Sequence, residues 1–451
     1  MPPSMLKLKP EDIDNEEERR NYTVTIIGCE LTGIFHAYLF AKAGFKVNCT
    51  DLNPIKVKAI TKWKEIFLKR EILLEIRKYI KKGLLKITDN IEEAVSSSDI
   101  LILTFKVKLD RNKKSDYSLL EKTCKKVGPV LKRGSLVIVA NATGVGITEG
   151  LVKQILEDSS GFKVGVDFGL AYSPLKIFND ELLTSSKCIV AAEDNKSLNA
   201  ATIVLEKVAN TSLEKIRSLK TAEAAVIFDA VQHDVNAALA NELALFCEKV
   251  GIDYFTAKKV FNDLSNPTLS LAKTRIEPYL LLEDAENLNL KLQLPKLSRQ
   301  INEKTAKHTV DLVRNALKSC GKPLRRSKIA ILGITQARNM RSPPQKIIRK
   351  LAKTLTVKGA KISVYDPYLP RYELPELQST TSKTLTEAVE GTDCIIIVKG
   401  HNQFKRLNLN KLKITMRMPA AIVDLEEALE PEKVEKAGFI YRGLGRGVWT
   451  K

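Results

Sequence analysis

Short apolar runs alternate along this chain with longer segments in which apolar and polar residues follow a helical period. Residues 23–28 (TVTIIG) form one such run, and its length and β-branched residues predict a buried parallel strand that ends at a glycine. A helical pattern follows, and the next strand is expected within residues 44–51 (GFKVNCTD). Together these segments predict a strand–helix–strand unit.

The same arrangement recurs in the last third of the chain. Residues 328–333 (KIAILG) repeat the first run, and residues 359–366 (GAKISVYD) repeat the second, with the aspartate again seven residues after the glycine. Residues 98–103 (SDILIL) and 392–397 (TDCIII) form a further matching pair. This internal repeat predicts an α/β protein with two Rossmann-like domains, each a doubly wound parallel sheet.

Between the two halves the pattern changes to that of a long helix. Residues 221–250 are rich in alanine and contain neither Pro nor Gly, which predicts a central helix of about 30 residues. Its apolar positions lie on more than one side, so it needs more than one partner surface. We expect it to join the halves and to pack against a second copy of the chain in a homodimer. Burial within one chain is the alternative.

These patterns predict the organisation of the whole chain. A weaker helical stretch over residues 296–319 leads into a basic linker at residues 322–326. The expected parts are a charged N-terminal tail (1–20), an N-terminal Rossmann domain (21–215), a central helical dimerisation domain (216–320) and a C-terminal Rossmann-like domain (321–451).

Composition narrows the class of protein. The 451 residues are 44% hydrophobic and 28% charged, as in soluble globular proteins of two or three domains. No apolar run approaches the roughly 20 residues of a membrane-spanning helix, and the first 20 residues lack the apolar core of a signal peptide. The seven cysteines have neither paired nor metal-ligand spacing, which indicates reduced thiols, no metal site and a cytoplasmic location.

The charge balance adds a further possibility. Lysine and arginine number 73 against 53 acidic residues, a formal net charge of +20. Such a chain attracts anions, so binding of a nucleic acid or an acidic partner is one hypothesis. Because the basic residues are spread along the chain and no nucleic-acid-binding motif is present, a solvated lysine-rich surface is the favoured interpretation.

Several separate segments, in order, resemble one family. The chain is similar to the UDP-glucose/GDP-mannose dehydrogenase family, and to its UDP-N-acetylmannosamine dehydrogenases in particular, from about Tyr22 to Trp449. The segments that carry the resemblance are residues 145–149 (VGITE), 234–253 (DVNAALANELALFCEKVGID), 277–279 (EPY), 365–368 (YDPY) and 441–447 (YRGLGRG).

The resemblance implies a fold and an activity. It implies an N-terminal domain that binds NAD, a helical middle domain that forms the dimer, and a C-terminal domain that binds a UDP-sugar. On the UDP-sugar side it implies Asn236, Arg341 and Arg446. The family oxidises the sugar C6 hydroxyl to a carboxylate with two NAD molecules, and a cysteine thiolate attacks the intermediate aldehyde to give a thioester that is then hydrolysed.

At the position of that cysteine this chain has a lysine. Alignment on residues 277–279 places Lys273 there, and the family's neighbouring glycines are absent. A lysine could form an imine with an aldehyde if burial lowered its pKa. The alternative is an exposed, protonated lysine without a chemical role.

Other positions of the family's chemistry are also changed. The catalytic lysine and asparagine of the family correspond to Val226 and Ala230, read from the Ala-Glu pair at residues 222–223. The glutamate of the family's Pro-Glu corresponds to Leu175, and its Phe-Lys after the strand of the C-terminal domain corresponds to residues 336–337 (QA). Neither Val226 nor Ala230 can transfer a proton or orient a water molecule as the family's residues do.

The dinucleotide fingerprint is altered as well. Residues 28–33 (GCELTG) keep Gly28 and Gly33 of the G-x-G-x-x-G pattern, but Glu30 replaces the middle glycine. A carboxylate about 4 Å from a phosphate would be repelled by about 4 kcal/mol in partly screened surroundings. Asp51, at the end of the second strand, could bind the ribose hydroxyls of NAD, or could serve only as a turn residue.

Three hypotheses follow. The first is a degraded member of the family, a pseudoenzyme with a binding, regulatory or assembly role. The second is an active NAD-dependent oxidoreductase that transfers a single hydride, with Lys273, His233 or Asp229 as its base. The third and weakest is a protein that binds nucleic acid or an acidic partner through its positive charge.

Overall fold

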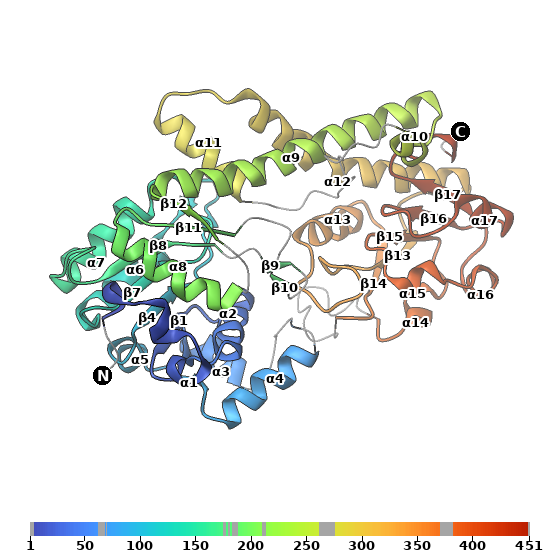
Figure 1. Ribbon diagram of the computed structural model, residues 1–451. Helices are drawn as coiled ribbons and strands as arrows, with labels where there is room; N and C mark the ends of the chain where they lie inside the picture. The colour runs from blue at the N-terminus through green and yellow to red at the C-terminus, as the bar shows by residue number, and fades with distance from the viewer. Residues whose placement is uncertain are drawn as a thin grey trace. The chain divides into compact units, whose positions relative to one another are not determined.

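The computed structural model describes most of the chain and divides it into two compact units. The described residues are 4–61, 68, 70–174, 177–178, 181–182, 188–209, 213–260, 276–369 and 382–449. The first unit comprises Met1–Ala230 and Ile276–Lys291, and the second comprises Val231–Arg275 and Leu292–Lys451. Most helices and strands of both units are labelled in Figure 1.

The first unit is built on an eight-stranded sheet within the described residues, in the order β12-β11-β8-β7-β4-β1-β2-β3. The six strands from β8 to β3 are parallel, and β11 runs antiparallel to β8. Its strands are β1 (Thr23–Ile27), β2 (Lys46–Thr50), β3 (Leu85–Ile87), β4 (Ile100–Leu103), β7 (Leu136–Val139), β8 (Gly169–Tyr172), β11 (Cys188–Ala191) and β12 (Leu213–Ile216).

Helices cover both faces of this sheet. The connections from β1 toward β3 and those from β4 toward β8 lead in opposite directions, so right-handed crossovers place their helices on opposite faces. On one face α2 (Leu31–Lys42) packs against α4 (Arg70–Lys81) and α8 (Asn195–Ala209). On the other, α6 (Ser118–Val127) packs against α5 (Ile91–Ser96) and α7 (Lys153–Ser160). The arrangement confirms the predicted doubly wound domain.

Shorter elements complete the first unit. They are η1 (Met5–Lys7), η2 (Pro10–Ile13), α1 (Glu16–Arg19), α3 (Pro54–Thr61), β5 (Lys108–Leu109), β6 (Ser115–Asp116), η3 (Gly128–Val130), η4 (Thr148–Val152), β9 (Ile177–Phe178), β10 (Glu181–Leu182) and α11 (Glu277–Asn287).

The start of the chain differs from the expected charged tail. Among residues 4–20, Met5, Leu8 and Ile13 are buried and belong to the apolar core of the first unit. The Arg19 guanidinium also donates a hydrogen bond to the carbonyl of Ile13 at 2.8 Å. Three apolar side chains spaced among charged ones are enough to fix this segment, because each is removed from water.

The predicted central helix is present as α9 (Leu219–Val250), 32 residues long. The boundary between the two units falls within it, between Ala230 and Val231. The division of the chain into three domains stays a prediction. No helix in the described ranges combines the length and the apolar character needed to cross a membrane.

The second unit holds a parallel sheet of five strands among its described residues, in the order β14-β13-β15-β16-β17. This is the order of a flavodoxin-like sheet, with its switch point between β13 and β15. Its strands are β13 (Lys328–Leu332), β14 (Lys361–Tyr365), β15 (Cys394–Ile397), β16 (Ala421–Asp424) and β17 (Ile440–Gly443). The two parallel sheets confirm the predicted fold class.

The helices of the second unit surround this sheet. Along one face α12 (Gln293–Ser319) packs against α13 (Lys346–Val357), and α14 (Leu385–Val389) packs against α16 (Leu409–Thr415). The remaining elements are α10 (Tyr254–Val260), α15 (Asn402–Lys405), α17 (Pro431–Lys436) and η7 (Gly447–Trp449). The strand side chains Leu332, Ile395 and Ile422 are 0% exposed and belong to one apolar core cluster of this unit.

Candidate functional site

The switch point of the first unit lies between β1 and β4, because the chain leaves these neighbouring strands in opposite directions. In open α/β sheets ligands bind in the crevice outside the carboxyl ends of the strands at such a point. A hollow is found there, and its lining includes Gly28, Glu30, Asp51, Lys56, Thr104 and Lys106. The structure therefore brings together Gly28, Glu30 and Asp51, three of the four residues predicted for the cofactor side.

The turn from β1 into α2 is shaped by two glycines. Gly28 has a φ of +118°, which side chains disfavour. A Cβ atom on Gly33 would lie 1.7 Å from the carbonyl oxygen of Gly28. That oxygen also accepts a hydrogen bond from the Thr104 hydroxyl at 3.0 Å. The turn therefore has the tight strand-to-helix packing that the first and third glycines of the fingerprint provide.

Asp51 lies just after β2 and is held in place by backbone groups. One carboxylate oxygen accepts the N–H of Cys29 at 2.9 Å, and the other accepts the N–H of Asn53 at 2.9 Å. The aspartate thus ties the glycine turn to the end of β2. Each carboxylate oxygen has further lone pairs, so this position still allows it to accept ribose hydroxyls.

Glu30, which replaces the middle glycine, forms an ion pair. It is the residue that precedes α2, its side chain does not cap the helix, and its Oε1 lies 2.8 Å from Nζ of Lys56 in α3. Burial favours the neutral form of Glu30, but Lys56, with help from Lys106 and Lys108, holds its pKa below the usual value. The carboxylate is therefore ionised and paired, which the sequence interpretation missed.

The hollow at this switch point is small as the side chains stand. Its volume is about 20 Å³, room for about one water molecule. Glu30 and Lys56 both line it. The glycines, the strand order and Asp51 fit a dinucleotide, whereas the ion pair has to move before a pyrophosphate can approach the first turn of α2.

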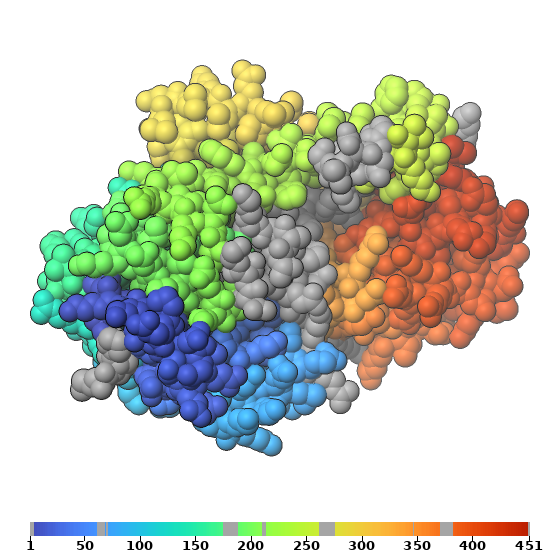
Figure 2. All heavy atoms as spheres, viewed as in Figure 1, coloured from blue at the N-terminus to red at the C-terminus, as the bar shows by residue number. Residues whose placement is uncertain are grey.

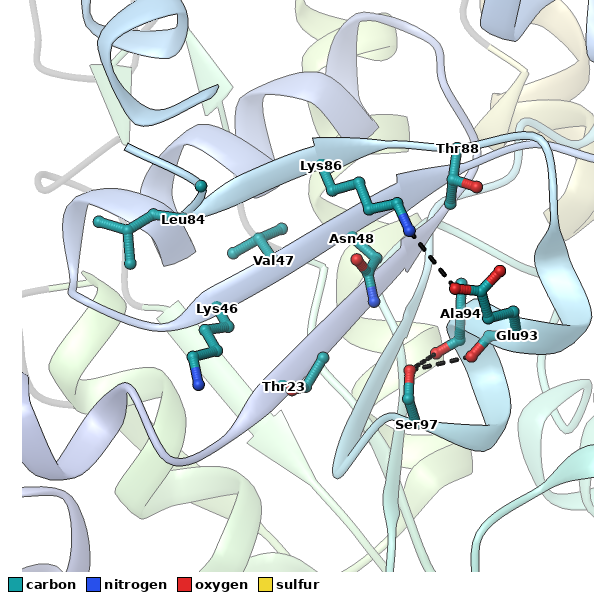
Figure 3. A pocket seen from close by; sticks show the side chains of 11 residues that line it. Thr23, Lys46, Val47, Asn48, Leu84, Lys86, Thr88, Glu93, Ala94 and Ser97 are labelled. Carbon is teal, nitrogen blue, oxygen red and sulfur yellow. Dashed lines mark hydrogen bonds and ion pairs between the residues drawn. The ribbon is translucent and has the colours of Figure 1, made fainter. Parts of the chain in front are cut away.

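A larger hollow of about 230 Å³ lies elsewhere in the first unit (Figure 3). Thr23 and Lys46, the first residues of β1 and β2, line it together with Lys86 and Glu93, whose side chains lie 3.4 Å apart. It lies over one face of β1, β2 and β3 beside α5, and not in the crevice beside Gly28 at the switch point. Its place in the fold argues against a role in cofactor binding.

A buried carboxylate fixes the loop that follows β7. Glu223 of α9 is 0% exposed and accepts hydrogen bonds from the N–H groups of Gly146 (2.6 Å) and Thr148 (2.8 Å) and from the Thr143 hydroxyl (3.0 Å). Burial raises its pKa, although these hydrogen bonds act in the opposite direction. Glu223 thus holds the loop that contains the predicted motif at residues 145–149.

The candidate residues on α9 lie downstream of this anchor. Val226 is half-buried and Ala230 is buried. Because both side chains are hydrocarbons, neither offers a polar group to a ligand. Asp229 and Asn236 are half-buried, and His233 is exposed. Asp229, which belongs to the first unit, does not line the hollow beside Gly28. The positions of Lys273 and Leu175 fall outside the described residues.

In the second unit, the general rule for such sheets places the ligand crevice at the switch point, at the carboxyl ends of β13, β14 and β15. Asp366 follows β14, and its Oδ2 accepts the N–H groups of Ile334 (2.7 Å) and Thr335 (3.0 Å). His401, which follows β15 and is 0% exposed, places Nε2 3.2 Å from the same oxygen and 3.0 Å from the Thr335 hydroxyl. Three side chains from three strand ends therefore meet at the switch point.

The hydrogen bonds of His401 define its tautomer. The N–H of Asn339 lies 2.9 Å from Nδ1, and because a backbone N–H can only donate, Nδ1 accepts and Nε2 carries the proton. The imidazole therefore donates to Asp366. Burial favours the neutral form of Asp366, but the contact with His401 and the backbone donors hold its pKa below the usual value. Sequence reasoning did not single out His401, since no charge pattern marks it.

A second carboxylate in this crevice binds two cations. Glu426, just after β16, accepts the Nε–H of Arg338 at 2.9 Å and the N–H of Gly400 at 3.1 Å, and it also pairs with Lys399. Although Glu426 is partly buried, the two cations hold its pKa below the usual value. The crevice therefore combines polar donors with a balanced set of charges.

The other two residues predicted for the UDP-sugar side have different surroundings. Arg341 is half-buried in the loop between β13 and α13, beside this crevice. Arg446 is 5% exposed, and its Nη1 lies 2.9 Å from both carboxylate oxygens of Asp253. Its guanidinium also lies 4.4 Å from the ring centroid of Phe255. Arg446 is thus part of a packed ion pair in this conformation.

Two family models match the units in the order that this geometry suggests. Residues 22–209 match the NAD binding domain of the UDP-glucose/GDP-mannose dehydrogenase family, and residues 330–431 match its UDP binding domain. The chain belongs to the UDP-glucose/GDP-mannose dehydrogenase family. The cofactor of the matched N-terminal domain is NAD, in agreement with the fingerprint turn and strand order described above.

Full-length relatives of the family align with this chain. A UDP-N-acetyl-D-mannosamine dehydrogenase of Pyrococcus horikoshii is 27% identical over 440 residues, which cover 94% of this chain and 99% of the relative. A UDP-N-acetyl-D-glucosamine 6-dehydrogenase of Salmonella typhi is 25% identical and covers 91% of this chain and 97% of the relative. The solved structure of the Pyrococcus horikoshii UDP-D-ManNAc dehydrogenase has a TM-score of 0.84 at 25% identity, covering 94% of this chain and 100% of that one.

The cysteines of this chain are all buried. All seven are described, and each is at most 6% exposed. Burial raises the pKa of the Cys124 thiol to about 12, and a hydrogen bond to Cys49, together with burial, raises that of Cys29. A nucleophilic cysteine has to reach its substrate as a thiolate. No cysteine of this chain presents an accessible thiol in this conformation.

Proposed function

We propose that this chain binds NAD and a UDP-sugar but does not carry out the cysteine-dependent oxidation of its family. The observation that carries the proposal is the burial of all seven cysteines. The replacement of the family's proton-handling residues by Val226 and Ala230 supports it. The protein then acts as a binding, regulatory or assembly partner on a retained dehydrogenase scaffold.

On the cofactor side, Gly28, Gly33 and Asp51 would hold the dinucleotide. The two glycines let the turn close tightly, and Asp51 would accept hydrogen bonds from the ribose hydroxyls. NAD supplies the hydride acceptor in oxidation of an alcohol. The residues of this chain would orient the dinucleotide after the Glu30–Lys56 ion pair has moved out of the hollow.

On the sugar side, the crevice of the second unit would hold the nucleotide. Thr335, Asp366 and His401 meet at its switch point, and Arg341 lies in the adjacent loop. The relatives are named for UDP-N-acetyl-D-mannosamine and UDP-N-acetyl-D-glucosamine, so these two UDP-sugars are the first ligands to test. Asn236 and Arg446 remain candidates that depend on the resemblance.

The experiment that tests this proposal is calorimetry with NAD and with each UDP-sugar separately. We expect saturable binding of NAD and of at least one UDP-sugar, since each unit retains the fold of the matching domain. The matching assay follows NADH absorbance with both ligands present, and we expect no sustained increase. Absence of binding by both ligand types would overturn the retained-scaffold part of the proposal.

An active oxidoreductase is the second candidate. What favours it is the near full-length alignment with proteins named as dehydrogenases. Such an enzyme would transfer one hydride, which requires a base but not a thiol. Lys273, His233 and Asp229 are the candidate bases. If activity were found and Lys273→Ala left it unchanged, the lysine version of this candidate would fail.

The assembly we propose is a homodimer formed through α9. Support comes from large apolar side chains on the part of α9 in the second unit, where Leu239 is 49% exposed, Phe246 60% and Val250 52%. In the same unit, Leu294 and Leu297 of α12 are 60% and 52% exposed. Exposed apolar groups of this number typically mark an interface. A cytoplasmic location accords with seven free thiols.

A further inference from the structure

The positive charge of this protein is concentrated, contrary to the expectation that it is spread along the chain. Residues 312–365 contain 14 lysines and arginines and neither aspartate nor glutamate. These 54 residues make up about one eighth of the chain. Their formal net charge is +14, and that of the whole chain is +20. A solvated lysine-rich surface normally intersperses acids with bases, so this distribution requires another explanation.

The segment comprises the end of α12 and then β13, α13 and β14. Along α13, Ile348, Leu351 and Leu355 are buried against the unit, while Lys350 and Lys353 are exposed. The buried face anchors the helix, so its outer face is left to the cations. Part of this segment is visible in orange in Figure 2.

The strand ends add cations to those of the helix. Lys328 and Lys361 are directly opposite each other as the first residues of β13 and β14, and both are exposed. Like charges opposite each other on neighbouring strands are destabilising. Arg326 lies next to them, since its N–H donates to the carbonyl of Gly359 at 2.8 Å.

These cations lack acidic partners in the described part of the chain. Lys350, Lys353, Lys358 and Lys361 form no ion pair there. Asp393, at the amino end of β15, is buried and already pairs with Lys322 at 2.8 Å. The self-repulsion of this group is therefore not relieved within the unit, and an external anion would relieve it.

This surface is separate from the nucleotide crevice of the same unit. Thr335, Asp366 and His401 lie at the carboxyl ends of the strands, whereas Lys328 and Lys361 lie at the amino ends. A helix between parallel strands runs back from the carboxyl edge to the amino edge, so Lys358, just after α13, also lies at the amino edge. The basic surface and the UDP-type crevice are thus at opposite edges of one sheet.

We propose that this surface, defined by Arg325, Arg326, Lys328, Lys350, Lys353, Lys358 and Lys361, binds the phosphate backbone of a nucleic-acid duplex. Residues 312–364 contain no aromatic residue that could stack on unpaired bases, which argues against single strands. Membrane insertion is disfavoured because the apolar face of α13 is buried. An acidic peptide added to the edge strand β14 would compete with Ser382, whose N–H already binds Val364.

The test is fluorescence anisotropy of the full-length protein with a labelled 20-base-pair DNA duplex. We expect binding that weakens steeply as salt rises from 50 to 200 mM, because phosphate contacts release counterions. The double variant Lys350→Glu/Lys353→Glu should bind about tenfold more weakly at 50 mM salt, and its salt dependence should be shallower by about two ions. Circular dichroism of the variant should be unchanged.

A matched control separates this surface from the general charge. Lys122→Glu/Lys125→Glu reverses two exposed lysines at the same spacing on α6, in the first unit, and should leave DNA affinity nearly unchanged. The proposal would be overturned by an equal loss of DNA affinity in both variants or by the absence of DNA binding at 50 mM salt. It would also be overturned if polyglutamate bound more tightly than DNA, or if a saturating UDP-sugar displaced the DNA.

Discussion

At the scale of single residues, the ion pair between Glu30 and Lys56 changes the meaning of an altered motif. Sequence reasoning expected a bare carboxylate that repels the pyrophosphate of NAD. The structure pairs that carboxylate with Lys56 at 2.8 Å, in a hollow of about 20 Å³. The two side chains therefore obstruct the cofactor mainly because they fill the hollow. An unbalanced negative charge is the smaller obstacle, since Lys56 neutralises it.

Removing Glu30 should make NAD binding easier. We expect Glu30→Ala to raise the affinity for NAD about tenfold, because the substitution empties the turn and leaves Lys56 available to a phosphate. Calorimetry at constant ionic strength measures the change. The matched control is Glu93→Ala, which removes an exposed acid paired with Lys86 at the other hollow. If Glu30→Ala bound NAD no better than this control, the ion pair would not obstruct the site.

Asp366 provides a prediction with a defined pH dependence. Its pKa is lowered in the folded protein, so the ionised form stabilises the fold above the unfolded-state pKa of about 4, and this contribution is lost as pH falls through the folded value. Asp366→Asn should lower the free energy of unfolding by about 1–3 kcal/mol at pH 7, because several buried donors lose a carboxylate. The difference from the wild type should shrink below pH 4.

Urea unfolding at several pH values between 7 and 3 checks this result. Asp311→Asn is the control, since Asp311 is half-exposed and forms only a surface ion pair with Arg314. A destabilisation by Asp366→Asn that stayed constant across the whole pH range would contradict the role given to its carboxylate.

At the scale of elements, the sequence predicted most of the regular structure. The runs at residues 23–28 and 328–333 became β1 and β13, and the absence of Pro and Gly over residues 221–250 correctly indicated α9. Hydrophobic periodicity suffices for such elements because their burial repeats along the chain. It failed for residues 4–20, where Met5 and Ile13 are too widely spaced to form a periodic pattern.

The exposed apolar face of α9 should control assembly. We expect Phe246→Glu to convert a dimer to a monomer, because a charge would have to be buried at the interface. Ile414→Glu is the control, since Ile414 is 87% exposed on α16 in the same unit. Sedimentation velocity of both variants measures the assembly state. A wild-type monomer, or a dimer that survives Phe246→Glu, would contradict the assignment of α9 as the interface.

At the scale of the whole molecule, the site was only partly predictable from the sequence. Gly28, Gly33 and Asp51 stood out because a short local pattern carries them. Lys56 and His401 did not, because their roles arise from pairing between segments distant in sequence, such as His401 with Asp366 and Thr335. The positive charge could be assigned to one surface only from the structure, because its cations come from β13, β14 and α13.

The two crevices and the buried thiols make one connected account. The family's scaffold is retained, with the NAD binding domain and the UDP binding domain in order. Of the chemical groups that the family uses, the thiol is the one on which the structure bears directly, since all seven cysteines are buried. Under the proposed function, what the protein does with its ligands depends on binding and not on oxidation.

The most direct measurement of this claim is product analysis by mass spectrometry. The purified protein is incubated with NAD and UDP-N-acetyl-D-mannosamine at concentrations where calorimetry shows binding, and NADH and sugar products are quantified together. The account predicts unchanged UDP-sugar and no NADH beyond a protein-free control. A UDP-uronate formed with two NADH per sugar, or an aldehyde formed with one, over many turnovers, would contradict it.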